Sequence, residues 1–223
     1  MANSESARMN KAEYWDERYQ SADDPPPREW HLGYDQLEGY LQEHVYPHWP
    51  ADASIMHPGA GSSHLPLEMR KRGGYTNITC AEFSPAVIAQ MQPLDPDIKW
   101  LQCDVRDMSA SGVGSDSFDV VFDKACFEAL CGWGPKHLLK EIPDVIVMDT
   151  RRYSQEAYRI LKPGGWFVII TVFEARYVHH LLKCEGTNWE DVHAPKALSA
   201  DGWMQTRSFC LRKPANQTTQ NND

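Results

Sequence analysis

The stretch from Ser54 to Ser63 constrains the fold most, because an apolar segment there runs directly into a turn with two glycines. Gly59 can adopt a positive φ, and Gly61 has no side chain where the backbone must approach a ligand closely. The acid Glu82 ends the next apolar segment, about 20 residues downstream, where such folds place a carboxylate that binds ribose. This order predicts a nucleotide pocket at the carboxyl edge of a parallel sheet.

The glycine turn departs from two common phosphate-binding motifs. The third glycine of a dinucleotide fingerprint would fall at His64, and no Gly-Lys-Ser or Gly-Lys-Thr of a P-loop follows. A loop that merely carries two glycines is the simpler alternative, and the later acids Glu82 and Asp104 argue against it. We therefore expect a nucleoside ligand without a pyrophosphate.

Strand-like and helix-like segments alternate along the chain. Short apolar segments predict strands at Ser54–Pro58, Asn77–Phe83, Ile98–Cys103, Phe118–Phe122 and Trp166–Val172. Helices are expected at Tyr34–Tyr46, Leu65–Arg72, Pro85–Met91, Ser154–Leu161 and Glu174–Lys183. Continuous apolarity indicates strands covered on both faces, and segments near Trp189–His193 and Arg207–Arg212 suggest a closing antiparallel hairpin. The predicted fold is α/β, a doubly wound, mostly parallel Rossmann-like sheet.

Composition bounds the domain organisation and the kinds of partner. The 223 residues suit one domain at 11–213, and polar composition predicts disordered ends at 1–10 and 214–223. A net charge of −9 argues against direct binding of nucleic acid, since phosphates are neutralised by clustered Lys and Arg. It favours a cationic ligand or a basic partner, although acidity that only keeps the protein in solution explains it equally well.

The cysteines and the N-terminal residues indicate where in the cell the protein is expected. Six cysteines include no Cys-x-x-Cys pair and are expected to be buried free thiols in a reducing compartment. The first thirty residues lack the apolar core of a signal peptide, and no run of 18 apolar residues predicts a membrane span. We expect a cytoplasmic protein, and the spacing of the histidines predicts no metal site.

Three acids follow three successive predicted strands: Glu82, Asp104 and Asp123. The ends of parallel strands share one edge of the sheet, so these carboxylates are expected to converge on one crevice. Such a crevice favours a nucleoside that carries a positive charge. S-adenosylmethionine fits this description, because its sulfonium is cationic and it has no pyrophosphate.

The chain resembles the class I S-adenosylmethionine-dependent methyltransferases, and more narrowly the group that modifies lysines of translation elongation factor 1-alpha. The resemblance covers roughly Glu13 to Leu182 and implies a seven-strand sheet with an N-terminal helical lid. It rests on Glu13-Tyr14-Trp15-Asp16-Glu17-Arg18-Tyr19, Gly59-Ala60-Gly61, Glu82-Phe83-Ser84, Asp104-Val105 and Asp123-Lys124-Ala125-Cys126-Phe127-Glu128-Ala129-Leu130.

The resemblance implies roles at individual positions. Eleven residues would contact the cofactor. They are the lid aromatics Trp15, Tyr19 and Trp30, the turn Gly59, Ala60 and Gly61, the ribose acid Glu82 with its neighbour Phe83, Asp104 and Val105 at the adenine edge, and Lys124. Simpler alternatives remain. The aromatics could belong to an amphipathic helix packed on the core, Asp104 could cap a turn or helix, and Asp123 with Lys124 could be an exposed strand end.

Two segments depart from the family pattern. His57-Pro58 precedes the glycine turn where relatives usually have aliphatic residues, and Pro58 removes a backbone donor. The usual Asp-Lys-Gly-Thr-Leu-Asp-Ala segment has Ala125-Cys126-Phe127-Glu128 in its middle. The stretch Cys131–Arg152 is expected to be a substrate-side loop of this chain's own.

The sequence as a whole predicts methyl transfer to the amine of a protein lysine, with elongation factor 1-alpha as the implied partner. The candidate catalytic residues are Asp123, Lys124 and Glu128, where Asp123 or Glu128 would accept a proton or position the amine. The alternatives are a small-molecule methyltransferase and a noncatalytic module that binds S-adenosylmethionine. An NAD-dependent oxidoreductase ranks last, because His64 replaces the third glycine.

Overall fold

The sheet at the centre of the molecule has the strand order that a doubly wound fold requires. The computed structural model describes residues 8–23, 25–132, 142–199 and 205–215. Within these residues eight strands form one sheet in the order β3-β2-β1-β4-β5-β8-β6, and β7 pairs with β8. Strands β1 to β5 are parallel and β8 runs antiparallel to β5. The predicted mostly parallel sheet is confirmed. The strands are β1 (Ser54–Pro58), β2 (Asn77–Glu82), β3 (Lys99–Gln102), β4 (Phe118–Lys124), β5 (Leu161–Thr171), β6 (Glu190–Asp191), β7 (Lys196–Ala197) and β8 (Arg207–Arg212).

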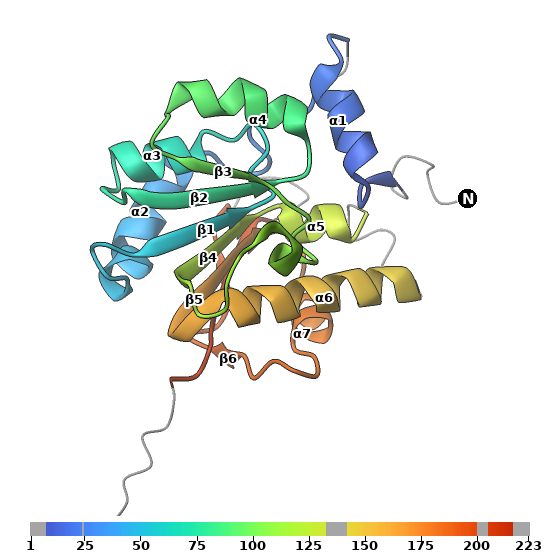
Figure 1. The fold of residues 1–223 in the computed structure, drawn as a ribbon. Coiled ribbons are helices and arrows are strands. Elements are labelled where there is room, and N and C mark those ends of the chain that lie inside the picture. The colour runs from blue at the N-terminus through green and yellow to red at the C-terminus, as the bar shows by residue number, and fades with distance from the viewer. Residues whose placement is uncertain (1–7, 24, 133–141, 200–204, 216–223) are drawn as a thin grey trace, which may run out of the picture.

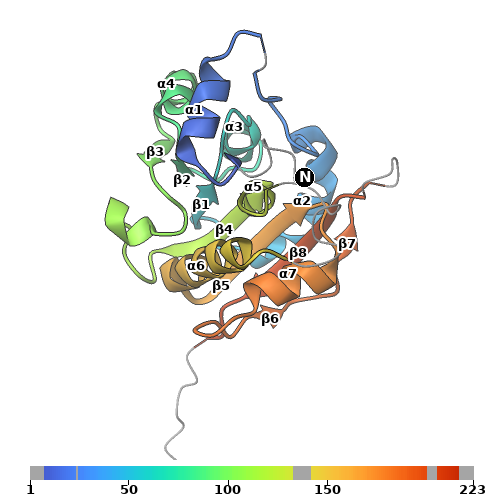
Figure 2. The same cartoon turned by 90° about the vertical axis from the view of Figure 1, so that its right-hand side faces the viewer.

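Helices cover both faces of the sheet (Figures 1 and 2). The apolar side chains of α2 and α3 pack on one face, and those of α5, α6 and α7 pack on the other. Helix α4 contacts β3 at the edge of the sheet, and α1 packs beside α4 on the side where the parallel strands end (Figure 1). The helices are α1 (Ala12–Gln20), α2 (Tyr34–His44), α3 (Leu65–Lys71), α4 (Pro85–Met91), α5 (Cys126–Leu130), α6 (Asp144–Ile160) and α7 (Ala175–Leu182), with short 3-10 turns at Tyr46–His48, Gln92–Leu94 and Met108–Ser111.

Helix α6 is longer than the sequence predicts, since it begins at Asp144 and not at Ser154. The expectation of a loop as far as Arg152 is therefore wrong over 144–152, and residues 133–141 lie outside the described part. The face of α6 that packs on the protein includes polar residues, so the regular spacing of apolar residues that would predict this helix is hidden. Ser154 donates to the carbonyl of Leu182 at 2.6 Å and is buried, so this polar position is part of the packed core.

Two residues just before α1 pack against the body of the protein. Met9 and Asn10 are buried, and Asn10 donates to the Asp149 carboxylate of α6 at 3.0 Å. Composition assigned both residues to a disordered end, because a contact with a residue 139 positions away leaves no local signal. The segment before α1 thus lies against the part of the protein where the strands end.

The described residues contain neither a helix that could span a membrane nor a cluster of metal ligands. Their helices are too short or too polar to cross a bilayer. Their His, Cys, Asp and Glu side chains form no group of three that could hold a metal ion.

His57, at the end of β1, is a polar side chain in an apolar place. It is 1% exposed and packs against Phe122, and neither ring nitrogen has a hydrogen-bond partner among the described residues. Burial, with the nearby charge of Lys124, lowers the pKa of His57 to about 3. The imidazole is therefore neutral in the folded protein at pH 7.

Because the folded-state pKa lies below the ordinary value, protons bind the unfolded chain preferentially and stability falls as the pH drops below about 6.5. One such group costs on the order of 2 kcal/mol between pH 7.5 and pH 5. We expect His57→Leu to reduce this loss, as measured by urea unfolding at both pH values. His180→Leu, on an exposed histidine of α7, is the control and should leave the loss unchanged. An unaltered pH dependence in His57→Leu would contradict the assignment.

Ala125 joins β4 to α5 in a left-handed backbone conformation, with φ of 71°. The family resemblance places a glycine there, and an alanine in this region costs roughly 1 to 2 kcal/mol. We expect Ala125→Gly to raise the free energy of unfolding by roughly 0.5 to 1 kcal/mol, after the greater freedom of the unfolded chain is included.

The same substitution at Ala89, an exposed position within α4, should act in the opposite direction and cost about 1 kcal/mol. Chemical denaturation of both variants gives the comparison. Equal losses at the two positions would show that Ala125 carries no strain.

Candidate cofactor site

A cavity lies at the carboxyl ends of the parallel strands, beside the point where the order of the sheet reverses between β1 and β4. Open α/β sheets bind their ligands at such a point. The cavity and its opening to solvent together hold about 770 Å³ of space. Its walls come from the lid, the glycine turn and the ends of β2, β3 and β4: Met9, Trp15, Tyr19, Arg28, Trp30, Gly59, Ala60, Gly61, Ser62, Ser63, Glu82, Phe83, Cys103, Val105, Lys124, Ala125, Cys126, Ala129 and Leu130.

Both glycines of the turn are required by their surroundings. Gly59 and Gly61 have φ of 55° and 54°, in the region where side chains are strained. A Cβ at position 59 would lie 2.7 Å from the Cys126 sulfur, and one at position 61 would overlap the Tyr19 hydroxyl. The turn therefore packs directly against α1 and α5, which explains why this loop carries glycine at both positions.

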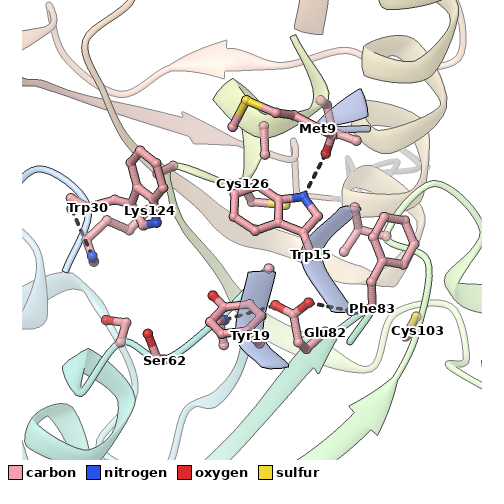
Figure 3. A pocket seen from close by; sticks show the side chains of 18 of the residues that line it. Met9, Trp15, Tyr19, Trp30, Ser62, Glu82, Phe83, Cys103, Lys124 and Cys126 are labelled. Carbon is pink, nitrogen blue, oxygen red and sulfur yellow. Dashed lines mark hydrogen bonds between the residues drawn. The ribbon is translucent and has the colours of Figure 1, made fainter. Parts of the chain in front are cut away.

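Glu82 connects the turn to the end of β2 (Figure 3). One carboxylate oxygen accepts from the amide of Gly61 at 2.9 Å, and the other accepts from those of Phe83 at 2.7 Å and Ser84 at 3.1 Å. Burial raises the pKa of Glu82 against the lowering effect of these donors. A carboxylate has about four acceptor positions, so Glu82 lines the cavity with capacity left for a ligand hydroxyl.

Asp104, the second of the three acids, does not line the cavity as Glu82 does. Phe83 and Val105 line the cavity, whereas Asp104 is not among its lining residues. The Asp104 carboxylate binds Arg106 at 2.8 Å through Nη2 and at 2.9 Å through Nε, and that guanidinium stands 5.6 Å from the Phe83 ring. Contact of Asp104 with an adenine edge stays a prediction.

The helix α1 forms the lid side of the cavity. Trp15 donates through Nε1 to the carbonyl of Met9 at 2.7 Å, and its ring lies 6.2 Å from those of Tyr19 and Trp30. The Asp16 carboxylate, on the same helix, accepts from the Ser84 hydroxyl at 2.8 Å. The aromatic residues thus both pack α1 on the body and line the cavity.

Lys124 is the buried cation of the site. Its side chain is 2% exposed, and Nζ donates to the Glu29 carboxylate at 2.8 Å and to the carbonyl of Trp30 at 3.0 Å. Burial lowers the pKa of Lys124 although Glu29 raises it. Lys124 and Glu29 together form a pair without net charge at the cavity wall.

Asp123 and Glu128 lie behind the wall. Asp123 accepts from the amides of Cys126 at 2.9 Å and Phe127 at 3.0 Å, and from the Tyr153 hydroxyl at 2.6 Å, so it caps α5. Burial raises the pKa of Asp123 to about 7. Both acids are fully buried and neither is among the lining residues, so a direct role in proton transfer stays a prediction.

Most candidate cofactor residues are brought together: Trp15, Tyr19, Trp30, Gly59, Ala60, Gly61, Glu82, Phe83, Val105 and Lys124 all line the cavity. The candidate cofactor set left out the other lining residues: Met9, Arg28, Ser62, Ser63, Cys103, Ala125, Cys126, Ala129 and Leu130. Cys126 was interpreted as a buried thiol, and burial does raise its pKa well above the usual range. Its position two residues after Lys124 was the available signal for a place in the wall.

The donor set suits S-adenosylmethionine. Glu82 offers an acceptor for ribose hydroxyls, Phe83 and Val105 form an apolar surface for a base, and aromatic faces attract a cation such as a sulfonium. The Lys124 charge, which would repel a sulfonium, is offset by Glu29. The residues present therefore fit this group in size, polarity and charge.

Comparison with known proteins agrees with this geometry. Residues 56–169, just over half of the chain, match the family model of a methyltransferase domain. The chain is 31% identical over 161 residues to EEF1A lysine methyltransferase 4 of Mus musculus and 30% identical to the Bos taurus protein of that name, covering 72% of this chain and 60% of each relative. The chain thus spans about three fifths of the length of these relatives.

A solved structure supports the fold in particular. An S-adenosylmethionine-dependent methyltransferase from Clostridium acetobutylicum superposes with a TM-score of 0.61 at 8% identity, covering 83% of this chain and 94% of that one. The family match and the fit of the cavity lining make S-adenosylmethionine the cofactor. The chain belongs to the methyltransferase domain family and is a class I S-adenosylmethionine-dependent methyltransferase.

Proposed function

We propose that this protein methylates the side-chain amine of a lysine in a protein substrate, of the kind that translation elongation factor 1-alpha represents. The mammalian relatives at about 30% identity are named as lysine methyltransferases of that factor. The proposal includes a cytoplasmic location, which suits the six cysteines that are all free thiols. It includes no direct contact with nucleic acid, in keeping with the net charge of −9.

In this proposal different residues of the cavity wall bind different portions of the cofactor. Glu82 accepts from the ribose hydroxyls, while Phe83 and Val105 flank the adenine. The Gly59–Gly61 turn contacts the methionine portion, and the lid aromatics Trp15, Tyr19 and Trp30 face the sulfonium. A cation–π contact contributes roughly 0.5 to 2 kcal/mol, depending on how far water is excluded.

The observation that carries the acceptor assignment is the state of Lys124 in this same cavity. Burial lowers the pKa of Lys124, even with Glu29 beside it. A lysine amine ordinarily has a pKa of about 10.4 and must lose a proton before it can attack a methyl group. An acceptor lysine that enters the cavity beside Trp15 and Trp30 would meet the same desolvation, which favours the neutral amine.

The chain contributes mainly alignment and exclusion of water. The cofactor supplies a methyl group that is already activated by the positive sulfur. Trp15, held by the Met9 carbonyl, and Trp30, held through Lys124, form two walls that fix the direction of approach. Glu29 offsets the charge of Lys124 and so preserves the attraction of the site for a cation.

Incubation with methyl-labelled S-adenosylmethionine and purified elongation factor 1-alpha tests the proposal. We expect label in methylated lysine after hydrolysis of the protein, and Trp30→Leu should lower the initial rate at least tenfold because it removes one wall. Trp100→Leu, which shortens a half-buried tryptophan that does not line the cavity, is the matched control.

Two outcomes separate the rival functions. Label confined to the small-molecule fraction of a cell extract would show a small-molecule methyltransferase. Tight cofactor binding with no label in proteins or small molecules would identify a noncatalytic module.

A further inference from the structure

A buried hydrogen bond between two side chains holds the chain in place beside the cavity, although neither side chain lines the cavity. His31 Nε2 lies 2.6 Å from a Glu128 carboxylate oxygen, and their side chains are 8% and 1% exposed. The residues next to them, Trp30 and Ala129, both line the cavity. The pair therefore joins two parts of the wall from behind.

The segment 29–31, which we call the strap, is attached at three separate places. Glu29 accepts from the Ser63 hydroxyl at 2.7 Å and the His64 amide at 2.8 Å, next to the glycine turn. The Trp30 carbonyl accepts from Lys124 at the end of β4. His31 reaches α5 through Glu128. Figure 3 shows the Trp30 ring beside Lys124, across the cavity from Tyr19.

The Glu128 carboxylate is set in place independently of the strap. Its other oxygen accepts from the amide of Val172 at 2.6 Å and from the Thr171 hydroxyl. Glu128 is thus a fixed anchor at the end of β5, and His31 is the partner that joins it to the strap.

The backbone of His31 needs such an anchor. Its φ of 63° is left-handed, which is uncommon for a residue with a side chain and persists where surrounding contacts determine it. This conformation turns the chain so that Trp30 faces the cavity while His31 faces α5. Without the contact to Glu128, the strap would lose the restraint that favours this turn.

We propose that His31 is a positioning residue for methyl transfer, and that its pair with Glu128 holds Trp30 as the cavity wall over the cofactor. The inference rests on S-adenosylmethionine as the cofactor and is independent of which acceptor is methylated. It gives Glu128 a role in holding the wall instead of one at the reacting atoms.

Three variants test this positioning role through equilibrium binding of S-adenosylmethionine, measured by calorimetry. His31→Gly permits the left-handed backbone and removes the pair, so it should raise Kd at least tenfold. His31→Gln retains a donor and should stay within threefold of the wild type. Glu128→Gln should raise Kd in the wild-type background but not in His31→Gly, because residues that act as one unit are non-additive.

Matched measurements separate positioning from simple stability. His180→Gln, on an exposed histidine of α7, should leave Kd unchanged. Quenching of tryptophan fluorescence by acrylamide should increase in His31→Gly, and that increase should disappear in the Trp30→Phe background. If Glu128→Gln fails to fold, the Kd values of His31→Gly and His31→Gln still show whether His31 has a positioning role.

The proposal is overturned if folded His31→Gly binds the cofactor within twofold of the wild type, or if its quenching is unchanged. Either result would mean that the pair serves the fold alone. Neither measurement uses a methyl acceptor. An absence of lysine methylation would therefore overturn the proposed function and leave this test of His31 unaffected.

Discussion

The buried carboxylate of Glu82 organises the ligand-facing edge of this protein. It binds the amides of Gly61, Phe83 and Ser84, so one side chain ties the glycine turn to the end of β2 and to the start of α4. Each hydrogen bond to a charged group contributes roughly 1.5 to 3 kcal/mol net. Ser84 in turn donates to Asp16 of the lid helix, which extends the connection from the sheet to α1.

The wall of the cavity around Trp30 is held by two pairs of hydrogen-bonded side chains. Lys124 Nζ lies 2.8 Å from the partly exposed Glu29 carboxylate, and His31 Nε2 lies 2.6 Å from that of Glu128, so the buried Lys124 and Glu128 side chains each have a partner within hydrogen-bond distance. A buried charge without a partner would be strongly destabilising. Glu82 has no cationic partner among the described ion pairs, and three backbone amides bind its carboxylate instead. Aromatic rings complete the wall and exclude water.

How far the sequence predicted this protein depends on the range of the contacts involved. Strands β1, β2 and β4 were predictable because buried parallel strands are continuously apolar, and Glu82 was predictable from its place after such a strand. The first half of α6 was not, because Asp149, Thr150 and Ser154 on its buried face disguise the helical period. Asp104 was assigned to the ligand, yet it binds Arg106 only two residues away, a local signal that was available in the sequence. His31 and Glu128 meet across 97 positions, and no short motif encodes that distance.

Calorimetric titration of S-adenosylmethionine into wild type and Glu82→Gln tests the central claim most directly. Gln removes the charge and keeps one acceptor oxygen, which can serve the amides of Phe83 and Ser84, whereas its NH2 group would face the Gly61 amide. Glu43→Gln, on an α2 side chain that is 75% exposed, is the matched control. We expect one site per chain in the wild type and in Glu43→Gln, and a Kd raised at least tenfold in Glu82→Gln, in keeping with the loss of one charge-assisted hydrogen bond. An unchanged Kd in folded Glu82→Gln would show that the cofactor binds elsewhere.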